Sequence, residues 1–415
     1  MIPERATPTP HRAQLGLVLA GGAARGAYQV GALSYMAEEV SRTLGYDIPL
    51  DILSGTSVGA INAVSMAAFA DEPRGRVARL RSVWTNLRVE DVLRPIAGGA
   101  VDLLRGLLGR HVEQTSSLFD PSALQGLLTD SIPFEQIDRH LREGRIRAVT
   151  VSATQVATGR TVVFVQRRHA RPDPWTGTTL VVPRAVRLRT SHVLASAAVP
   201  LLFPAVELHG RYYCDGGLRQ NIPLSPARRL GATHILVINP RHATGAGRSA
   251  AIEAEREEYF PNPLFLLGKA LNALLLDRID NEIDRLEKIN AILEAGTRSY
   301  GDAFSETLSR ELGYPAGSGL RRVRIVHLRA SENIGAMCAD FVRSPKFRVG
   351  GVLGRVMRRL AEGESRREAD LLTYLLFDGA FAEQLIELGR DDARRHHDAL
   401  CALFDEVLRE RAAGR

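Results

Sequence analysis

A single serine stands between two glycines in the stretch LSGTSVGAINA, residues 53 to 63. The run Gly55, Thr56, Ser57, Val58, Gly59 has the GxSxG spacing of a nucleophilic serine on a sharp strand-to-helix turn, where side chains at the flanking positions would clash. The motif is short, so its context decides. It follows the apolar run LDILS and precedes an alanine-rich helical segment. The sequence therefore predicts that Ser57 is a nucleophile; the alternative is a structural turn serine.

A second glycine-rich turn, AGGAARGAYQ at residues 20 to 29, also joins an apolar run to a helical pattern. A dinucleotide-binding loop is disfavoured because Ala23 occupies a position where that fingerprint needs glycine, and the GK[ST] ending of a P-loop is absent. Glycines allow backbone N–H groups to approach a ligand closely, and a helix that begins near Arg25 adds the positive end of its dipole. This turn is therefore expected to form an oxyanion hole.

A nucleophilic serine needs a base, and RYYCDGGLRQNIP at 211 to 223 presents Asp215 directly before two glycines. Such a turn can bring a carboxylate to the same edge of the sheet as Ser57. Asp-Gly is also one of the commonest turn dipeptides, so an ordinary turn remains the alternative. A Ser-Asp-His arrangement is a further alternative, and His242, just after the apolar run HILVINP, is its best histidine.

Taken together, these pieces resemble the patatin-like phospholipase family. The resemblance rests on LVLAGGAARGAYQVGAL, GTSVG and DGG, which occur in the family's order. It extends through SSLFDPSALQGLL at 116 to 128 and LASAAVPLLFPAVELHGRYYCDGG at 194 to 217, and more loosely through TYLLFDGAFAEQLIELGRDDA at 373 to 393.

The resemblance implies a serine lipid acyl hydrolase with a Ser57–Asp215 dyad that works without histidine. It assigns the remaining site positions as follows: Gly21, Gly22, Ala23, Arg25 and Gly26 to the oxyanion loop, Gly55 and Gly59 to the nucleophile elbow, and Gly216 and Gly217 to the aspartate turn. The family usually has a third glycine where Ala23 stands, and the methyl group fits if the φ angle of that residue is negative.

The resemblance also implies a phospholipid or related acyl ester as substrate, with no calcium requirement. No cofactor is expected, and no metal site either, because no His, Cys or carboxylate cluster has ligand spacing. Two other functions stay open: an acyltransferase with an acceptor other than water, and a non-enzymatic lipid-binding module on the same scaffold. The sequence leaves the lipid head group and the oligomeric state undetermined.

Short apolar runs that alternate with helical patterns must position these residues. Strands are expected at 15 to 20, 50 to 54, 147 to 155, 160 to 166 and 234 to 240. This alternation predicts a three-layer αβα fold with a mostly parallel central sheet, plus a largely helical C-terminal part. We expect a flexible tail over 1–13, a catalytic core over 14–240 and a helical extension over 241–415, whose strand at 321–329 rejoins the sheet; a separate helical domain is the alternative.

Composition limits the possible environments and partners. The formal charge is +7 and the pI about 9.6, but arginines alternate with acidic residues and no nucleic-acid-binding motif is visible, so nucleic acid is not an expected partner. Three scattered cysteines, with no Sec-type signal or transmembrane run, suggest a soluble cytoplasmic chain. Lipid as substrate suggests peripheral membrane contact, with residues 92 to 110 and 262 to 293 as candidate segments.

Overall fold

The computed structural model describes residues 13–98, 117–168, 175, 180–242, 279–314, 319–363 and 371–413. The expected N-terminal tail lies outside the described residues except for Ala13. Residues 99 to 110 and 262 to 278 of the two expected membrane-contact segments also lie outside them.

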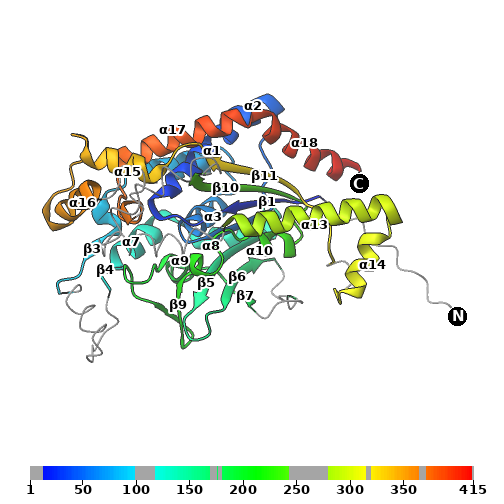
Figure 1. Cartoon of the computed structure of the whole chain (residues 1–415), viewed down its shortest axis with the longest axis horizontal. Coiled ribbons are helices and arrows are strands. Elements are labelled where there is room, and N and C mark those ends of the chain that lie inside the picture. The colour runs from blue at the N-terminus through cyan, green and yellow to red at the C-terminus, as the bar shows by residue number, and fades with distance from the viewer. Residues whose placement is uncertain are drawn as a thin grey trace.

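A mostly parallel sheet forms the centre of the molecule (Figure 1). Along it the strand order is β11-β10-β1-β2-β5-β6-β7, and β9 pairs with both β5 and β8. The run from β11 to β5 is parallel throughout, whereas β5 pairs antiparallel with β6 and β9. The strands are β1 (Leu15–Leu19), β2 (Ile52–Thr56), β5 (Ala148–Gln155), β6 (Thr161–Arg167), β7 (Val181–Ala185), β8 (Val206–Leu208), β9 (Arg211–Asp215), β10 (His234–His242) and β11 (Arg324–Ala330). A separate antiparallel pair is formed by β3 (Arg94–Pro95) and β4 (Phe119–Asp120).

Helices flank this sheet and confirm the predicted α/β architecture. They are α1 (Gly26–Tyr35), α2 (Ser41–Leu44), α3 (Val58–Ala68), α4 (Gly75–Thr85), α5 (Val89–Val92), α7 (Ser122–Ser131), α8 (Phe134–Glu143), α9 (Thr190–Ala197), α10 (Leu224–Arg229), α13 (Ile279–Tyr300), α14 (Phe304–Glu311), α15 (Ile334–Arg343), α16 (Gly351–Gly363), α17 (Gly379–Arg395) and α18 (His397–Ala413). Short 3-10 or π turns are η1 (Ala23–Arg25), η2 (Met36–Val40), η3 (Gly216–Leu218) and η5 (Leu371–Tyr374). All residues of β1 and β2 are buried, as strands covered on both faces require.

Chain direction places two groups of helices on opposite faces of the sheet. The chain moves from β1 through β2 to β5 in one direction, and β10 and β11 lie on the other side of β1. Because crossovers between parallel strands are right-handed, α3 between β2 and β5 and α13 between β10 and β11 cover opposite faces. The direction reverses at β1, and the carboxyl end of a sheet at such a switch point is where α/β proteins bind ligands.

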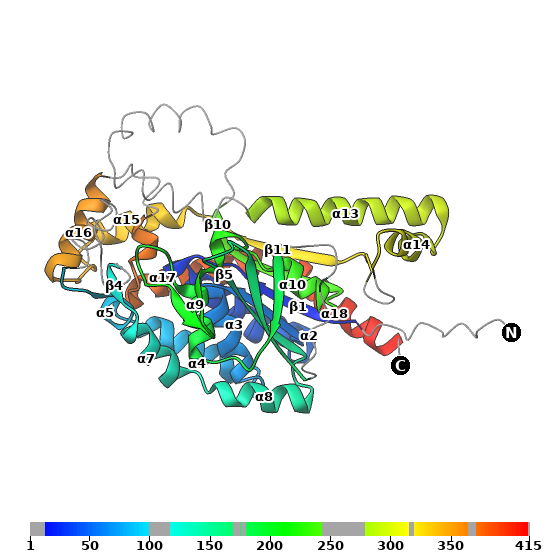
Figure 2. The same ribbon diagram turned by 90° about the horizontal axis from the view of Figure 1, so that it is seen from below.

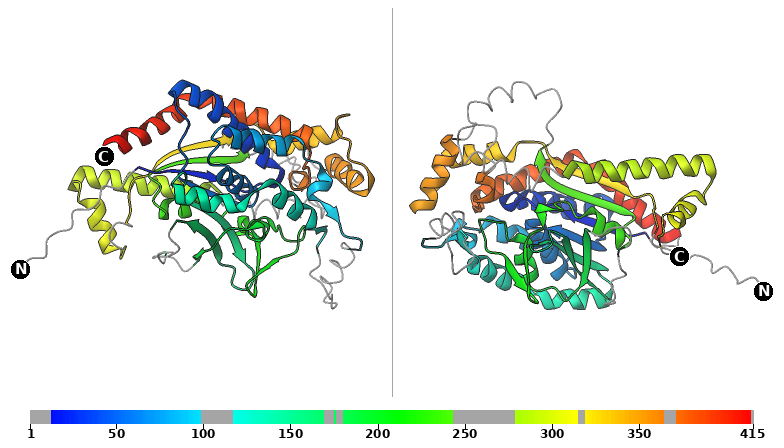
Figure 3. Two further views of the ribbon diagram at one scale, coloured as in Figure 1. Left: turned by 180° about the vertical axis from the view of Figure 1, so that it is seen from behind. Right: turned by 60° about the horizontal axis from the view of Figure 1, so that its bottom comes forward.

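The C-terminal part adds one strand to the central sheet and one helix against α1. β11 lies where residues 321 to 329 were expected to form a strand, and it pairs in parallel with β10. α17 packs along α1 (Figure 1), with contact so close that a Cβ added at Gly31 would lie 1.9 Å from the Ile386 carbonyl oxygen. Figures 2 and 3 show α16 at one end of the molecule and α14, with the outer end of α13, at the other. In the described part of the chain no helix is both long and apolar enough to cross a membrane.

Candidate active site

The turn after β2 holds Ser57 in a strained backbone conformation. Its φ is 54° and its ψ −127°, between the last residue of β2 and the first of α3. The turn is possible because glycines flank it: a Cβ on Gly55 would lie 2.2 Å from the Gly59 carbonyl oxygen, and one on Gly59 would lie 2.2 Å from the Leu19 carbonyl oxygen. A positive φ at a non-glycine residue persists only where its surroundings enforce it, which is typical of functional turns.

Asp215, at the end of β9, accepts a hydrogen bond from this serine. Ser57 Oγ donates to Asp215 Oδ2 over 2.6 Å, and the Gly217 N–H donates to the second carboxylate oxygen, Oδ1, over 2.7 Å. Gly216 allows the turn, because a Cβ there would lie 2.2 Å from the Ser152 carbonyl oxygen. The structure therefore brings the two residues of the expected dyad into direct contact.

Burial sets the electrostatics of this pair. Asp215 is 1% exposed and Ser57 6% exposed. Burial raises the pKa of Asp215 to about 6, and the hydrogen bonds from Ser57 and Gly217 oppose that rise. A carboxyl group with this pKa is a better proton acceptor near neutral pH than an ordinary aspartate, while still being mostly ionised.

The glycine-rich loop after β1 lies against the same turn. A Cβ added to Gly21 would lie 3.3 Å from Ser57 Cβ. The Gly21 N–H donates to the Asn221 carbonyl oxygen, and the Arg25 N–H donates to the Gly22 carbonyl oxygen. Within the described residues, the N–H groups of Gly22 and Ala23 donate to no protein acceptor. The Ala24 N–H also donates to no acceptor among the described residues, so these three groups are donors that the loop can offer a ligand.

The backbone at Ala23 does not meet the condition of a negative φ under which its methyl group would fit without strain. Its φ is +49°, in the left-handed region that favours glycine, and Gly22 before it has a φ of +157°. The conformation follows from the tight course of the loop from β1 into η1. The methyl group of Ala23 is thus accommodated at a cost in backbone strain, on the order of 1 kcal/mol.

A buried polar network holds the loop on α3 and α4. Gln29 Nε2 donates to the Ala20 carbonyl oxygen over 2.7 Å, and Asn62 Nδ2 donates to Gln29 Oε1 over 2.8 Å and to the Gly26 carbonyl oxygen over 3.1 Å. Trp84 Nε1 completes it by donating to Asn62 Oδ1 over 3.1 Å. Both ends of the loop are fixed relative to the helix that follows Ser57.

Sequence reasoning missed two polar residues of the site. Ser196 Oγ accepts from the Ser57 N–H over 2.8 Å and donates to the Ser152 carbonyl oxygen over 2.6 Å, so it fixes the elbow. The Asn221 side chain lies against Gly21, and its Nδ2 is buried without a hydrogen-bond partner in the described part of the chain. Ser196 lies in a stretch that carried the family resemblance and Asn221 lies shortly after it, but neither position has a spacing that reveals its contact with Ser57 or Gly21.

The two histidines closest to the apolar run of β10 make other contacts. His242 Nδ1 lies 3.2 Å from the Ala330 carbonyl oxygen, and His234 Nδ1 lies 2.9 Å from Thr233 Oγ1. His234 begins β10, at the end of the sheet opposite Ser57; with Glu406 and Glu410 it could offer ligand atoms within 4.8 Å of one another. That group is therefore remote from the dyad.

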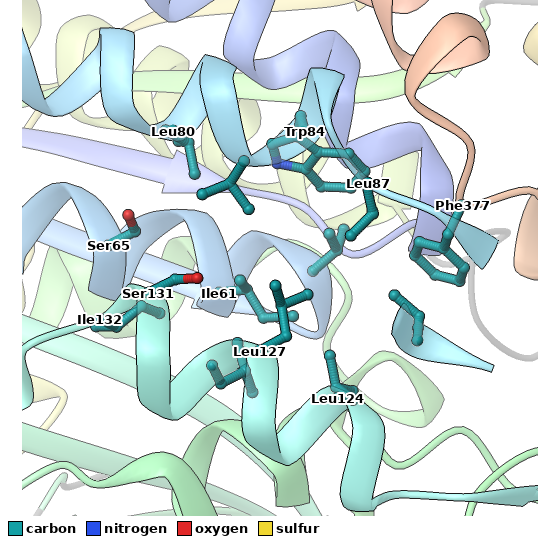
Figure 4. A pocket seen from close by; sticks show the side chains of 14 residues that line it. Ile61, Ser65, Leu80, Trp84, Leu87, Leu124, Leu127, Ser131, Ile132 and Phe377 are labelled. Atoms are coloured by element: carbon teal, nitrogen blue, oxygen red, sulfur yellow. The ribbon is translucent and has the colours of Figure 1, made fainter. Parts of the chain in front are cut away.

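An apolar cavity of about 390 Å³ opens beside Ser57 and Ala23. It continues into a second cavity of about 520 Å³, because the two share Val58, Ile61, Val92, Leu124 and Phe377. Figure 4 shows the second one, where side chains of α3, α4 and α7 converge with Phe377. Its lining is almost wholly hydrocarbon, with two serines at the far end.

The C-terminal part supplies one wall of this space. Tyr374 and Phe377 line the cavity beside Ser57, more than 300 positions away in the chain. The cavity was not foreseen from the sequence, since its walls come from segments that only the tertiary fold brings together.

Comparison with known proteins relates the chain to a protein family. A sequence profile described as patatin-like phospholipase matches residues 17–228, just over half of the chain. Patatin-like phospholipase domain-containing protein 7 of Mus musculus is 28% identical over 225 residues, and its counterpart ZK370.4 of Caenorhabditis elegans is 29% identical over 223. Each alignment covers 54% of this chain and 13% of the relative, so the chain spans only a small part of the length of these curated relatives.

Among solved structures, human GIVD cytosolic phospholipase A2 matches with a TM-score of 0.43 and 11% identity over 96% of this chain and 63% of that one. VipD from Legionella pneumophila gives a TM-score of 0.35 and 14% identity over 94% of this chain and 67% of that one. The profile match covers the glycine-rich loop, the serine elbow and the aspartate turn together. The chain belongs to the patatin-like phospholipase family.

Proposed function

We propose that the protein is a serine hydrolase of lipid acyl esters that works through a Ser57–Asp215 dyad and an acyl-enzyme. The observation that carries the proposal is the 2.6 Å hydrogen bond from Ser57 Oγ to a buried carboxylate, at the mouth of an apolar cavity. A nucleophile in contact with its base, beside space for hydrocarbon, is what ester hydrolysis of a lipid requires.

In the first half of the reaction, Ser57 Oγ forms a bond to the ester carbonyl carbon while its proton passes to Asp215. The tetrahedral intermediate collapses, the bond to the leaving alcohol breaks, and Asp215 returns the proton to that alcohol. In the second half, water attacks the acyl-enzyme and gives its proton to Asp215, which then reprotonates Ser57 as the fatty acid leaves.

The negative charge on the carbonyl oxygen needs donors during both halves. The N–H groups of Gly22 and Ala23 are suited to this role, because neither donates elsewhere in the described residues and the loop is fixed by the network through Gln29 and Asn62. Donors that are fixed in advance stabilise a developing oxyanion without reorganisation. The start of η1 and α1 adds the positive end of a helix dipole.

The acyl chain fits the two joined apolar cavities. The described residues that line them carry no charged group, so a fatty-acyl chain is favoured over a polar acyl group. The proposal involves no calcium, and activity in the presence of a chelator is the corresponding test.

Substitution of the dyad tests the proposal directly. Ser57→Ala and Asp215→Asn should each lower kcat by several orders of magnitude, because the first removes the nucleophile and the second an acceptor for its proton. Hydrolysis of a phospholipid panel by purified protein, with labelling by a fluorophosphonate probe, measures both. Ser34→Ala is the matched control, since the Ser34 hydroxyl is also buried but donates to the Val30 carbonyl oxygen within α1.

Substitution of His242 distinguishes the dyad from a Ser-Asp-His triad, and the dyad predicts little effect. His242→Ala should leave kcat within a few-fold of the wild-type value, since the ring lies against the Ala330 carbonyl. A folded but inactive His242→Ala, or an active Asp215→Asn, would overturn the dyad. Retained labelling and turnover in Ser57→Ala would mean that another residue is the nucleophile, whereas no labelling and no turnover of the wild-type protein would favour a binding function of this scaffold.

Contact with a membrane surface follows from a bilayer substrate, and we propose residues 92 to 110 as its first candidate on sequence grounds alone. Flotation with anionic vesicles should weaken when Leu103, Leu104, Leu107 and Leu108 are made polar. Unchanged flotation would exclude this segment as the anchor.

A further inference from the structure

A second large cavity, here called the arginine cavity, lies on the opposite side of the sheet from the acyl cavities. It is lined by α10 and α13 together with the starts of β6 and β7, and it encloses about 1290 Å³, including open solvent at its mouth. Neither Ser57 nor Asp215 lines it, and it shares no lining residue with the two apolar cavities. Its function is therefore separate from the ester-cleaving site.

Positive charge accumulates in this cavity. Arg219, Arg228, Arg229 and Arg285 line it, and among the described residues of its lining Glu282 is the one acidic side chain. Burial, and then the charge of Arg228, lower the pKa of both Arg229 and Arg321. The guanidinium groups therefore repel one another, and a bound anion would relieve that repulsion.

A serine hydroxyl and a tryptophan ring contact one of these arginines. Arg229 Nε donates to Ser225 Oγ over 3.1 Å, and its guanidinium carbon lies 5.6 Å from the centre of the Trp175 ring. Both contacts help to orient the guanidinium group. Planar guanidinium groups match phosphate oxygens with paired hydrogen bonds, which makes phosphate the favoured anion.

The side chain of Gln220 indicates that the ligand also carries a hydrogen-bond donor. This side chain is 3% exposed, lines the cavity and bonds the Glu282 carboxyl group, while its Oε1 has no hydrogen-bond partner in the described part of the chain. A buried acceptor without a donor is costly, and a ligand hydroxyl would satisfy it. Burial also raises the pKa of Glu282 to about 7, so at neutral pH this carboxyl group is partly uncharged and opposes an anion less.

We propose that the arginine cavity binds a polyol phosphate, with the phosphate among the arginine side chains and a hydroxyl of the polyol donating to Gln220 Oε1. The cavity offers cationic groups for the first and an unsatisfied acceptor for the second. No bond in the ligand is broken there, because no nucleophile or base of the dyad reaches the cavity.

Calorimetric titration of the full chain with glycerol 3-phosphate tests the site. We expect binding of one equivalent, weakened at least tenfold by Arg228→Gln or Arg219→Gln and unchanged by Arg355→Gln, an exposed arginine on α16 at the far end of the molecule (Figure 2). Thermal unfolding checks the fold: Arg228→Gln should be at least as stable as wild type without ligand, because it removes repulsion. Equal binding by all four proteins would mean adventitious charge attraction and would overturn the proposal.

Titration with inorganic phosphate measures the contribution of the phosphate group without that of the polyol hydroxyl group. It should bind more weakly than glycerol 3-phosphate, and Gln220→Met should abolish that difference while leaving phosphate binding in place. Equal affinity of the wild-type protein for both compounds would contradict the role of Gln220.

A polyol phosphate also occurs in the head groups of phospholipids. Binding to vesicles distinguishes a lipid head group from a free small molecule. Phosphatidylcholine vesicles with and without phosphatidylglycerol can be compared in the Ser57→Ala background, so that lipid is not consumed. Binding that needs phosphatidylglycerol and Arg228, without binding of free glycerol 3-phosphate, would identify a lipid head group; binding of the free compound would identify a small-molecule ligand. If neither free glycerol 3-phosphate nor phosphatidylglycerol vesicles bind through Arg228, the proposal is wrong, whatever the outcome for ester hydrolysis.

Discussion

At the scale of single residues, Asp215 must be ionised to accept the Ser57 proton, and burial raises its pKa to about 6. Activity should therefore rise with pH through about 6 and then level off. The acid limb of kcat/KM against pH reports the pKa of the free enzyme and measures this directly. An acid limb near pH 4 would mean that the carboxyl group titrates as if exposed.

The same shift affects stability. Since the pKa of Asp215 is about 6 in the folded chain and about 4 in the unfolded chain, the folded state binds more protons between these values, and stability falls as pH rises through this window. Relative to Asp215→Asn, the wild-type protein should lose about 2 kcal/mol of unfolding free energy between pH 4 and pH 7. Denaturant titrations of both proteins at the two pH values give the difference; a constant gap would contradict the shift.

Ala23 offers a second test at this scale. Its φ of +49° is strained for alanine, so Ala23→Gly should keep activity and gain up to about 1 kcal/mol of stability. Ala24→Gly is the matched control, because Ala24 has no positive φ and should lose about 0.5–1 kcal/mol on conversion to glycine. Equal effects of the two substitutions in thermal unfolding would mean that Ala23 is not strained.

The sequence identified Ser57 and Asp215 because each lies in a short motif whose neighbours are also constrained. It could not identify Ser196, Tyr374 or Phe377, since their roles depend on contacts with residues more than a hundred positions away. A sequence motif reflects constraints between residues that are close in the chain. The roles of these three residues depend instead on residues that are close only in the folded structure.

At the scale of elements, the strands were predictable where an apolar run ends at glycine or at a turn, as β1 and β2 do. The antiparallel pairing of β5 with β6 and β9 was not, because the expected alternation of strand and helix breaks down there and the chain returns through short connections. That reversal brings Asp215 of β9 beside the carboxyl end of β5, so the least predictable part of the sheet is the part that positions the base.

Three helices set the length of the acyl cavity, and α3 contributes Val58, Ile61 and Ser65 from one face (Figure 4). Ser65 lines only the cavity farther from Ser57, so Ser65→Leu should fill that end, lowering kcat/KM for long-chain esters at least tenfold while leaving short-chain esters within a few-fold. Ser82→Leu is the control, as Ser82 is exposed on α4 and outside the cavity lining. An unchanged chain-length profile would place the acyl chain elsewhere.

At the scale of the whole molecule, we propose that the C-terminal part folds as one unit with the catalytic core. β11 extends the sheet, Tyr374 and Phe377 line the cavity beside Ser57, and α17 packs on α1. These contacts explain why a helical extension that carries no catalytic motif still shows a loose family resemblance at residues 373 to 393.

Glycine substitutions test whether the C-terminal part and the core unfold as one cooperative unit. A Cβ at Gly389 of α17 would lie 2.1 Å from the Tyr28 carbonyl oxygen of α1, so Gly389→Ala should force the helices apart and cost about 1–3 kcal/mol. Gly126 of α7 has nothing within 4 Å of its added Cβ, so Gly126→Ala should instead stabilise the protein by up to about 1 kcal/mol. If the extension and the core form one cooperative unit, Gly389→Ala lowers the midpoint of a single thermal transition, and esterase activity is lost in that same transition. Two separate transitions, with activity surviving the first, would show instead that the extension is an independent domain resting on a self-sufficient core.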